Sequence, residues 1–258
     1  MPRTSAASGV STADREGCMK KGKKIIASVV LALLAVLGIG GFVYVSDYYH
    51  ADDDALKALN LQGDGVQVEQ DGAVMWFIPE NPAAGIIFYP GGKVEYTAYA
   101  PLLRALAEEG ILSALVKMPC NLAVLDADAA SGLKDKHPEV TSWYMAGHSL
   151  GGAMAANHAA KHADWYDGVI LLASYSTKDL NDTGLRVLSV YGSEDGVMNR
   201  ESYEKYRNNL PFDSTEVILP GGTHAQFGSY GPQAGDGKPT ISKEEQVMAT
   251  TEAVINWL

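Results

Sequence analysis

The chain has 258 residues, 47% of them hydrophobic and 20% charged, which is typical of a folded globular protein and excludes a disordered one. Its formal net charge is −11; because residues 1–24 contribute a net +4, the remainder sums to −15, and such an acidic body argues against nucleic acid as a partner. The two cysteines, Cys18 and Cys120, are too few for a disulfide framework or a cysteine-rich metal cluster. We interpret Cys120 as a small buried hydrophobic residue.

The N-terminal part of the chain predicts a membrane anchor. Residues 1–24 form a basic tail, and residues 25–46 are an uncharged run of 22 residues, long enough for a helix to cross a bilayer. The lysines that precede the run place the tail in the cytoplasm and the body on the extracytoplasmic side. A cleaved signal peptide is the alternative, but its apolar region would be shorter, and residues 42–49 are a poor cleavage site.

The body is expected to begin after a polar linker over residues 47–65, which includes a short helical stretch, and to be one domain over residues 66–258. Two strand-like runs come first, joined by the hairpin signal Asp71-Gly72. Further strands are predicted at residues 85–89, 111–116, 143–146, 169–173, 187–191 and 216–219. Helices are predicted at residues 96–109, 122–133, 150–162, 201–209 and 242–258, the last opened by a capping box from Ser242 to Glu245. Apolar strands that alternate with helices predict an α/β fold, with a mostly parallel sheet of about eight strands covered on both faces and the hairpin at one edge.

The segment Gly147-His148-Ser149-Leu150-Gly151 has the pattern G-x-S-x-G between a predicted strand and a predicted helix. That context is typical of a nucleophile elbow, in which a strained turn exposes a serine at the carboxyl edge of the sheet. Glycines are needed around it because side chains there would clash. We therefore predict Ser149 to be the nucleophile.

A serine hydroxyl needs a base to take its proton, and His224 is the best placed of the six histidines. It follows the last predicted strand, where this kind of sheet brings its base. His158 and His162, spaced i, i+4, could bind a metal, but no third ligand is evident, so we interpret them as a surface helix face and expect no metal. His148 is interpreted as serving the turn through its backbone.

The base also needs a carboxylate to orient it, and the developing oxyanion needs two backbone N–H donors. Asp195 follows the strand before the base, which gives the order Ser149, Asp195, His224; Glu194 is its nearest rival. One oxyanion donor is expected from Leu150. The other is expected from Gly92, with Lys93 as the alternative.

Several motifs resemble known proteins. They are Tyr89-Pro90-Gly91-Gly92, Tyr99-Ala100-Pro101-Leu102, Met118-Pro119-Cys120-Asn121-Leu122-Ala123 and the block from His224 to Gly237. With the elbow, they resemble the α/β-hydrolase superfamily and more narrowly α/β-hydrolase family 5, over roughly residues 73–258. The resemblance implies hydrolysis of an ester, thioester or amide through an acyl-enzyme. The chain departs from many relatives at Tyr89-Pro90, where they have His-Gly, and this leaves the second oxyanion donor open.

Lys93, Gln226, Phe227 and Tyr230 are candidate substrate contacts, although for the last three we favour packing of the base loop over lining the acyl or alcohol pocket. Asp236 is interpreted as closing a turn. Residues 174–185 are too short and polar to form a cap, so we expect an open Ser149 pocket bounded by the Gly92 and His224 loops.

These features predict a membrane-anchored serine hydrolase that acts on small carboxylic esters. Dienelactone-hydrolase-like or peptidase-like activity at the same residues is an alternative, and a non-catalytic binding module is another. The expected partners are a small-molecule acyl substrate and, through residues 25–46, the membrane. No cofactor is expected, and whether the chain has protein partners is left open.

Overall fold

The computed structural model describes residues 12–61 and 65–258. The chain divides into two compact units, one ending at Asp47 and the other comprising Tyr48–Leu258. Residues 1–11 of the predicted cytoplasmic tail and residues 62–64 of the predicted linker lie outside the described residues.

The first unit contains the helix α1, Thr12–Ser46. Its segment Val29–Ser46 has a mean hydropathy of 2.4 and is the one candidate membrane span among the described residues. Large apolar side chains such as Leu31, Leu37 and Phe42 are exposed to solvent along it. By length and composition this helix could act as a membrane anchor, as the sequence predicts.

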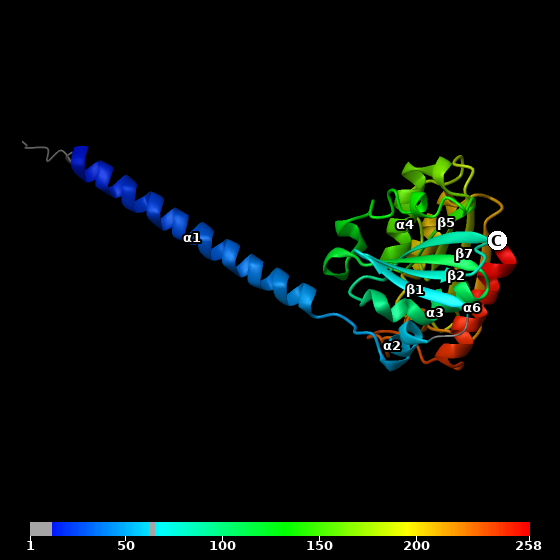
Figure 1. Ribbon diagram of the computed structural model, residues 1–258. Helices are drawn as coiled ribbons and strands as arrows, with labels where there is room; N and C mark the ends of the chain where they lie inside the picture. Colours follow the sequence, from blue (N-terminus) through cyan, green and yellow to red (C-terminus); the bar gives the residue numbers. More distant parts are fainter. Residues whose placement is uncertain (1–11, 62–64) are drawn as a thin grey trace, which may run out of the picture. The chain divides into compact units, whose positions relative to one another are not determined.

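The second unit is built on one eight-stranded sheet (Figure 1). The strands are β1 Val66–Asp71, β2 Val74–Pro79, β3 Ala84–Tyr89, β4 Ile111–Val116, β5 Trp143–His148, β6 Gly168–Leu172, β7 Arg186–Gly192 and β8 Thr215–Leu219. Their order is β1-β2-β4-β3-β5-β6-β7-β8; β2 pairs antiparallel with β1 and β4, and all other pairs are parallel. The predicted sheet, with its antiparallel hairpin at one edge, is confirmed.

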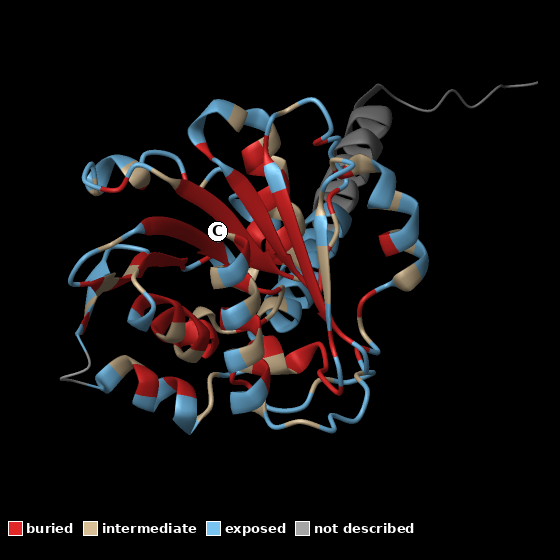
Figure 2. Ribbon diagram, turned by 90° about the vertical axis from the view of Figure 1, so that its right-hand side faces the viewer, coloured by how far each residue is buried: buried red, intermediate tan, exposed pale blue. Residues whose placement is uncertain are grey.

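Helices cover both faces of the sheet, whose central strands are fully buried (Figure 2). The α-helices of this unit are α2 Asp53–Asn60, α3 Ala100–Glu108, α4 Leu150–Lys161, α5 Arg200–Tyr206 and α6 Lys243–Trp257. The 3₁₀ helices are Tyr96–Tyr99, Pro119–Asn121, Ala123–Leu125, Lys134–Lys136, Ala163–Trp165, Arg207–Asn209 and Ala225–Phe227. Apolar residues of α3 and α6 share one core with the sheet, and alanines of α4 share the core on the opposite face. The predicted capping box of α6, Ser242 with Glu245, is confirmed.

The stretch predicted as a linker has structure of its own. Asp52 caps α2 by accepting hydrogen bonds from the backbone of Asp54 and Ala55, and Ala55 is fully buried. Tyr49 forms a parallel bridge with Val94. The described part of this stretch after Asp47 therefore packs onto the sheet domain.

Two expectations about the segment after β4 are wrong. Residues 122–133 form 3₁₀ turns in place of a helix, because the Tyr89 hydroxyl donates to the backbone carbonyl of Ala127 and accepts from the N–H of Ala130, groups that a helix would use itself. Cys120 is exposed instead of buried, in a turn where its φ is +50°. An anchored loop therefore lies where a helix was expected.

The absence of a cap is confirmed. Between β6 and β7 the chain contains no helix, and its backbone is bonded to the 3₁₀ helix Arg207–Asn209, which follows α5. Asn209 donates from its side chain to the carbonyl of Ser176, and the N–H of Leu180 donates to the carbonyl of Asn209. The segment between β6 and β7 therefore lies beside Ser149 with its backbone held in place by hydrogen bonds.

Candidate active site

Ser149 stands at the turn between β5 and α4 in a strained conformation. Its φ of +52° and ψ of −123° fall in a region that residues with a side chain rarely adopt. The turn is held on both sides: the N–H of Ser149 donates to the carbonyl of Leu172, and the Ser174 hydroxyl donates to the carbonyl of Ser149 at 2.7 Å. The local geometry is that of the predicted nucleophile elbow.

The glycines around Ser149 are required by close packing of the backbone. A Cβ on Gly151 would lie 2.2 Å from the carbonyl oxygen of Tyr89, and one on Gly147 would lie 2.6 Å from the backbone of Gly151. Any larger residue would push α4 away from the ends of β3 and β5. These glycines therefore set the height of Ser149 above the sheet edge.

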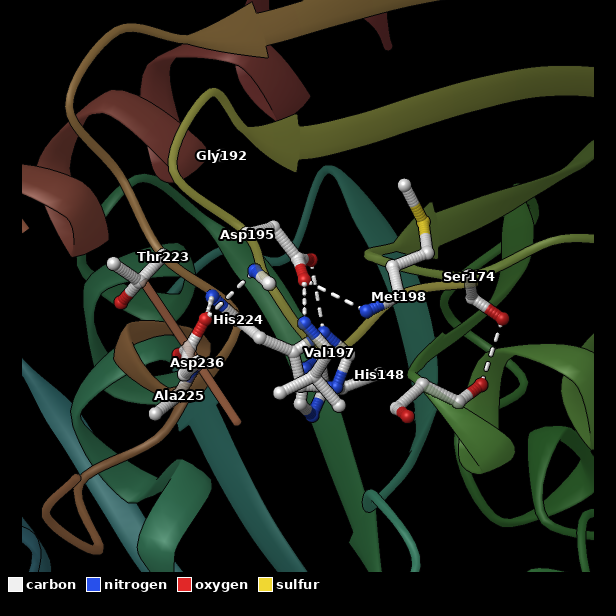
Figure 3. Close-up of polar contacts among 12 residues, drawn as sticks. His148, Ser174, Gly192, Asp195, Val197, Met198, Thr223, His224, Ala225 and Asp236 are labelled. Atoms are coloured by element: carbon white, nitrogen blue, oxygen red, sulfur yellow. Dashed lines mark hydrogen bonds and ion pairs between the residues drawn. The ribbon is translucent and has the colours of Figure 1, made fainter. Parts of the chain in front are cut away.

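His224 and Asp195 form a buried pair at the same edge of the sheet (Figure 3). His224 Nδ1 lies 2.9 Å from Asp195 Oδ2, and the two side chains are 1% and 0% exposed. Asp195 Oδ1 accepts hydrogen bonds from the N–H groups of Val197 and Met198. Burial would raise the pKa of the Asp195 carboxyl, but the bond and charge of His224 and these two N–H groups outweigh it and hold the pKa below its usual value. The rival Glu194 accepts instead from the Ser193 hydroxyl.

Asp236 has a larger part in this arrangement than closing a turn. Its Oδ1 accepts from the N–H groups of His224 and Gly196, at 3.2 and 3.1 Å, and its Oδ2 accepts from the N–H of Ala225 at 2.8 Å. One carboxylate thus joins the loop of the histidine to the loop of Asp195, as Figure 3 shows for its bonds to His224 and Ala225. The Gly235-Asp236-Gly237 motif was the available signal, but its long-range partners could not be read from the sequence.

The side chain of His148 also belongs to the site, in contrast to the expectation that only its backbone matters. It is 1% exposed, and its ring centroid lies 4.4 Å from that of His224. Its Nδ1 lies 2.8 Å from the Tyr99 hydroxyl, which also accepts the N–H of Gly91. Burial, followed by the neighbouring charge of His224, holds the pKa of His148 well below the ordinary 6.5, so the ring is neutral.

Ser149 and His224 are not hydrogen-bonded to each other in the described structure. His224 Nε2 is buried without a hydrogen-bond partner. His148 Nε2 beside it is also without a partner. Unbonded nitrogens are uncommon in buried positions, and a catalytic role is one of their recognised explanations. Catalytic hydrogen bonds are often long or misaligned before substrate binds.

Two backbone N–H groups near Ser149 donate to no other described residue. They belong to Gly92, in the turn after β3, and to Leu150, the first residue of α4, whose N–H has no partner within its own helix. A Cβ on Gly92 would lie 2.9 Å from the Leu150 side chain, so the two residues are neighbours. The N–H of the alternative donor, Lys93, is already bonded to the carbonyl of Asn121. The geometry favours Gly92 over Lys93.

A cavity of about 390 Å³ opens at Ser149, and its walls differ from those expected. Its lining residues are Ser149, Leu150, Ala153, Met154, Ala173, Ser174, Tyr175, Thr177, Val197, Met198 and Asn199. They come from α4, from the segment after β6 and from the loop after Asp195. The Gly92 and His224 loops contribute none of them.

The other candidate substrate contacts lie away from this cavity. Phe227 and Tyr230 are buried in the core, where Phe227 packs 5.6 Å from the His148 ring. Gln226 donates to the carbonyl of Ile241. These positions favour the packing interpretation of the three residues.

The alpha/beta hydrolase family matches residues 85–248, which is more than half of the chain. The chain therefore belongs to the alpha/beta hydrolase family, and the narrower resemblance to family 5 is confirmed. No curated protein sequence matches the chain significantly.

Solved structures with the same fold include enzymes with different named activities. Est1E from Butyrivibrio proteoclasticus is 17% identical, with a TM-score of 0.53. The match covers 74% of this chain and 98% of Est1E. A dienelactone hydrolase from Anabaena variabilis is 14% identical, with a TM-score of 0.51 and the same coverage. A membrane phospholipase A, described as a bacterial virulence factor, is 13% identical, with a TM-score of 0.55. The match covers 91% of this chain and 98% of the phospholipase. At these identities the likeness shows the fold, and with the family it supports a hydrolase.

Proposed function

We propose that the chain is a membrane-anchored serine hydrolase that cleaves small carboxylic esters through an acyl-enzyme on Ser149. The observation that carries the proposal is the buried Asp195–His224 pair beside the strained turn of Ser149. Such a pair costs free energy to bury unless its hydrogen bonds are complete. Here both oxygens of Asp195 are bonded, and His224 Nε2 is left as a free acceptor, which is the requirement for a general base.

In the proposed acylation step the Ser149 hydroxyl oxygen attacks the ester carbonyl carbon while His224 Nε2 takes its proton. Asp195 holds Nδ1–H toward itself and stabilises the imidazolium that forms. The negative charge on the carbonyl oxygen is met by the N–H groups of Leu150 and Gly92. The tetrahedral intermediate then collapses, and His224 gives its proton to the departing alcohol oxygen.

Deacylation uses the same groups with water as the nucleophile. His224 Nε2 takes a proton from the water as its oxygen attacks the acyl carbon, and it returns that proton to Ser149 as the acyl–oxygen bond breaks. The free carboxylic acid leaves. The cavity beside Ser149 would take the acyl part, because it is lined by Ala153, Met154 and Val197 and is near the lower end of the size range of ligand pockets.

The membrane part of the proposal rests on α1. Its exposed apolar segment would span the bilayer, with the lysines before it in the cytoplasm and the hydrolase domain on the other side. Protease added to intact spheroplasts should then digest the domain and spare the tail. Recovery of the full-length chain in the soluble cytosol would contradict the anchor.

Labelling with a fluorophosphonate tests the chemistry directly, because that reagent needs an activated serine. The full-length chain in detergent should be labelled once, at Ser149, and the Ser149→Ala variant should not be labelled. Hydrolysis is then measured on a panel of acetyl esters, lactones and peptides. Lactone or peptide turnover above ester turnover would establish one of the alternatives, and no labelling would favour a non-catalytic binding module.

A further inference from the structure

Two histidines and an aspartate come together at the far end of α4 from Ser149. His158 and His162 are one helical turn apart, and Asp128 comes from the loop that follows β4. One potential ligand atom of each of the three lies within 4.8 Å of the others. The sequence supplied only the i, i+4 spacing of the histidines; the third potential ligand is distant in sequence.

His158 is not on a surface face as the sequence suggested, because its side chain is fully buried. Both of its nitrogens have oxygen neighbours: Nδ1 lies 3.1 Å from Asp128 Oδ1, and Nε2 lies 2.9 Å from the Tyr166 hydroxyl. In metal sites one histidine nitrogen typically binds the metal while the other is hydrogen-bonded to an oxygen, and His158 has its two nitrogens placed in this way, toward Asp128 and toward the Tyr166 hydroxyl.

We propose that Asp128, His158 and His162 bind one divalent transition-metal ion of the zinc class. Two imidazole nitrogens and one carboxylate oxygen suit Zn²⁺, Co²⁺ or Ni²⁺ and do not suit Mg²⁺ or Ca²⁺, which prefer oxygen ligands alone. Binding changes the tautomer of His158. The proton that Nδ1 now donates to Asp128 is released to solvent, Nδ1 binds the ion, and the ring proton stands on Nε2, where the Tyr166 hydroxyl turns to accept it. Water completes the coordination.

Binding requires two side chains to move, because the His162 ring is stacked on Trp165 at 4.0 Å and Asp128 is bonded to His158. His158 is already fixed, while Asp128 is exposed and His162 is partly exposed, so these two side chains can close on the ion. The ammonium of Lys161, 3.3 Å from Asp128, must move away. Both partners of that ion pair are about half exposed, and such surface pairs contribute little to stability.

The position of the ion gives it a structural role. His158 follows Ser149 by nine residues, or about 14 Å along the helix, which is too far for contact with a reacting ester. Asp128 lies in the loop whose Ala127 and Ala130 bond to the hydroxyl of Tyr89, the last residue of β3. The ion would fasten this loop to the C-terminal end of α4, next to the strand that leads into the Gly92 turn.

Binding is tested on the full-length chain in detergent, purified without a polyhistidine tag and stripped with a chelator. Zn²⁺ titrated by calorimetry should bind with one-to-one stoichiometry and raise the Tm, because it binds only the folded state. Co²⁺ should give the intense visible spectrum of a low-coordinate site. Mg²⁺ should have no effect.

The variants Asp128→Asn and His162→Gln change exposed or partly exposed side chains and should fold. Each should weaken Zn²⁺ binding at least tenfold and remove the rise in Tm. Tyr166→Phe, which removes the bond behind His158, should weaken it by about tenfold, the lower end of the usual effect of such partners. The matched controls Asp126→Asn, in the same loop, and His50→Gln, exposed elsewhere, should bind as the unmodified chain does.

Equal Zn²⁺ affinity in the unmodified chain, Asp128→Asn and His162→Gln would overturn the proposal, as would no stoichiometric binding at all. In either case the three residues would be a polar cluster completed by hydrogen bonds alone. Because the readouts are affinity, spectrum and Tm, the outcome does not depend on the proposed hydrolase activity.

Discussion

The two flanks of Ser149 are built in different ways. We define the base flank as Asp195, His224 and Asp236 with His148 behind them, and the pocket flank as residues 173–177 and 197–199 with Met154 of α4. On the base flank side-chain atoms are fixed by hydrogen bonds, several of them across more than ten residues of sequence. On the pocket flank the walls are mainly apolar side chains in contact with each other and with the cavity.

This difference separates chemistry from selectivity. A hydrogen-bonded group has one useful position, so a change on the base flank should lower turnover for every substrate. Apolar contacts, and methionine above all, adapt to different shapes. A change of an apolar side chain on the pocket flank should therefore alter which substrate is preferred while leaving the chemistry in place.

The largest loss of kcat is expected when the nucleophile, the base or its carboxylate is replaced. Ser149→Ala and His224→Ala should each reduce kcat by about 10⁴-fold or more, and the double variant should lose little further, because the two act as a unit. Asp195→Asn should cost somewhat less than Ser149→Ala. Ester hydrolysis by the full-length chain measures this, and activity within about tenfold of the unmodified chain after Ser149→Ala would contradict the mechanism.

A smaller loss is expected from Asp236→Asn. The amide can accept only with its oxygen, so bonds to the N–H groups of Ala225, His224 or Gly196 are lost and the two loops shift. Small misplacements of catalytic groups cost up to about 10²-fold, so kcat should fall about 10- to 100-fold with KM little changed.

Asp213→Asn is the matched control for this change, because Asp213 is exposed in a turn before β8. Its kcat should equal that of the unmodified chain. If Asp236→Asn raised KM and left kcat unchanged, Asp236 would act in substrate binding and would not belong to the base flank.

The sequence predicted the fold and the main groups of the site because both depend on local patterns. Apolar strands that alternate with helices give the sheet, and the glycines around Ser149 mark the elbow without any long-range information. Asp195 and His224 could be placed because each follows a strand that ends at the same sheet edge. Their 2.9 Å contact is a consequence of the parallel topology.

What the sequence could not give depends on contacts between distant segments. The helix expected at residues 122–133 is replaced by turns because the Tyr89 hydroxyl bonds to that backbone, and nothing within the segment reveals this. The pocket walls were assigned to the wrong loops for the same reason. The side-chain role of His148 depends on Tyr99, 49 residues away.

A change of pH tests the buried state of His148. Its pKa is lowered in the folded chain, whereas an unfolded histidine has a pKa of about 6.5, so below that pH the unfolded state binds the extra proton and stability falls with falling pH. The unfolding free energy should therefore be lower at about pH 5.5 than at about pH 7.5, and His148 should account for part of that loss.

The His148→Gln variant should lack this part of the acid loss while keeping a partner for the Tyr99 hydroxyl. His158, whose pKa is also lowered, is present in both chains and cancels from the comparison. The lowered pKa of Asp195 adds an acid loss of the same sign, but only below about pH 4, outside the range used. Denaturant unfolding of both chains at the two pH values gives the difference, and identical losses would mean that His148 is protonated in the folded chain.

The smallest changes in kcat/KM are expected on the pocket flank. There the dependence of kcat/KM on acyl-chain length shows how much of the chain the cavity can bury. The segment between β6 and β7 forms no cap, so a long chain would leave the cavity and remain in solvent. Each further methylene should then contribute less than the roughly 0.8 kcal/mol, or about fourfold, of full burial. On p-nitrophenyl esters, kcat/KM should be highest from acetyl to butyryl and should fall by about C8, and a maximum at C12 or longer would require a long-chain groove that the described residues do not form.

Met154 is the residue through which this preference can be changed. It is partly buried on α4 and lines the cavity, so Met154→Ala enlarges the space beside Ser149 and should move the preferred acyl chain to a longer one. Met154→Trp fills that space and should confine activity to the shortest acyl groups. Acetyl-ester kcat should stay within about tenfold in both, because neither change touches a group of the base flank. Met248→Ala, on the exposed face of α6, should leave the chain-length profile unchanged. If Met154→Ala instead lowered kcat equally for every ester, the pocket flank would be part of the chemistry, and the division between the two flanks would fail.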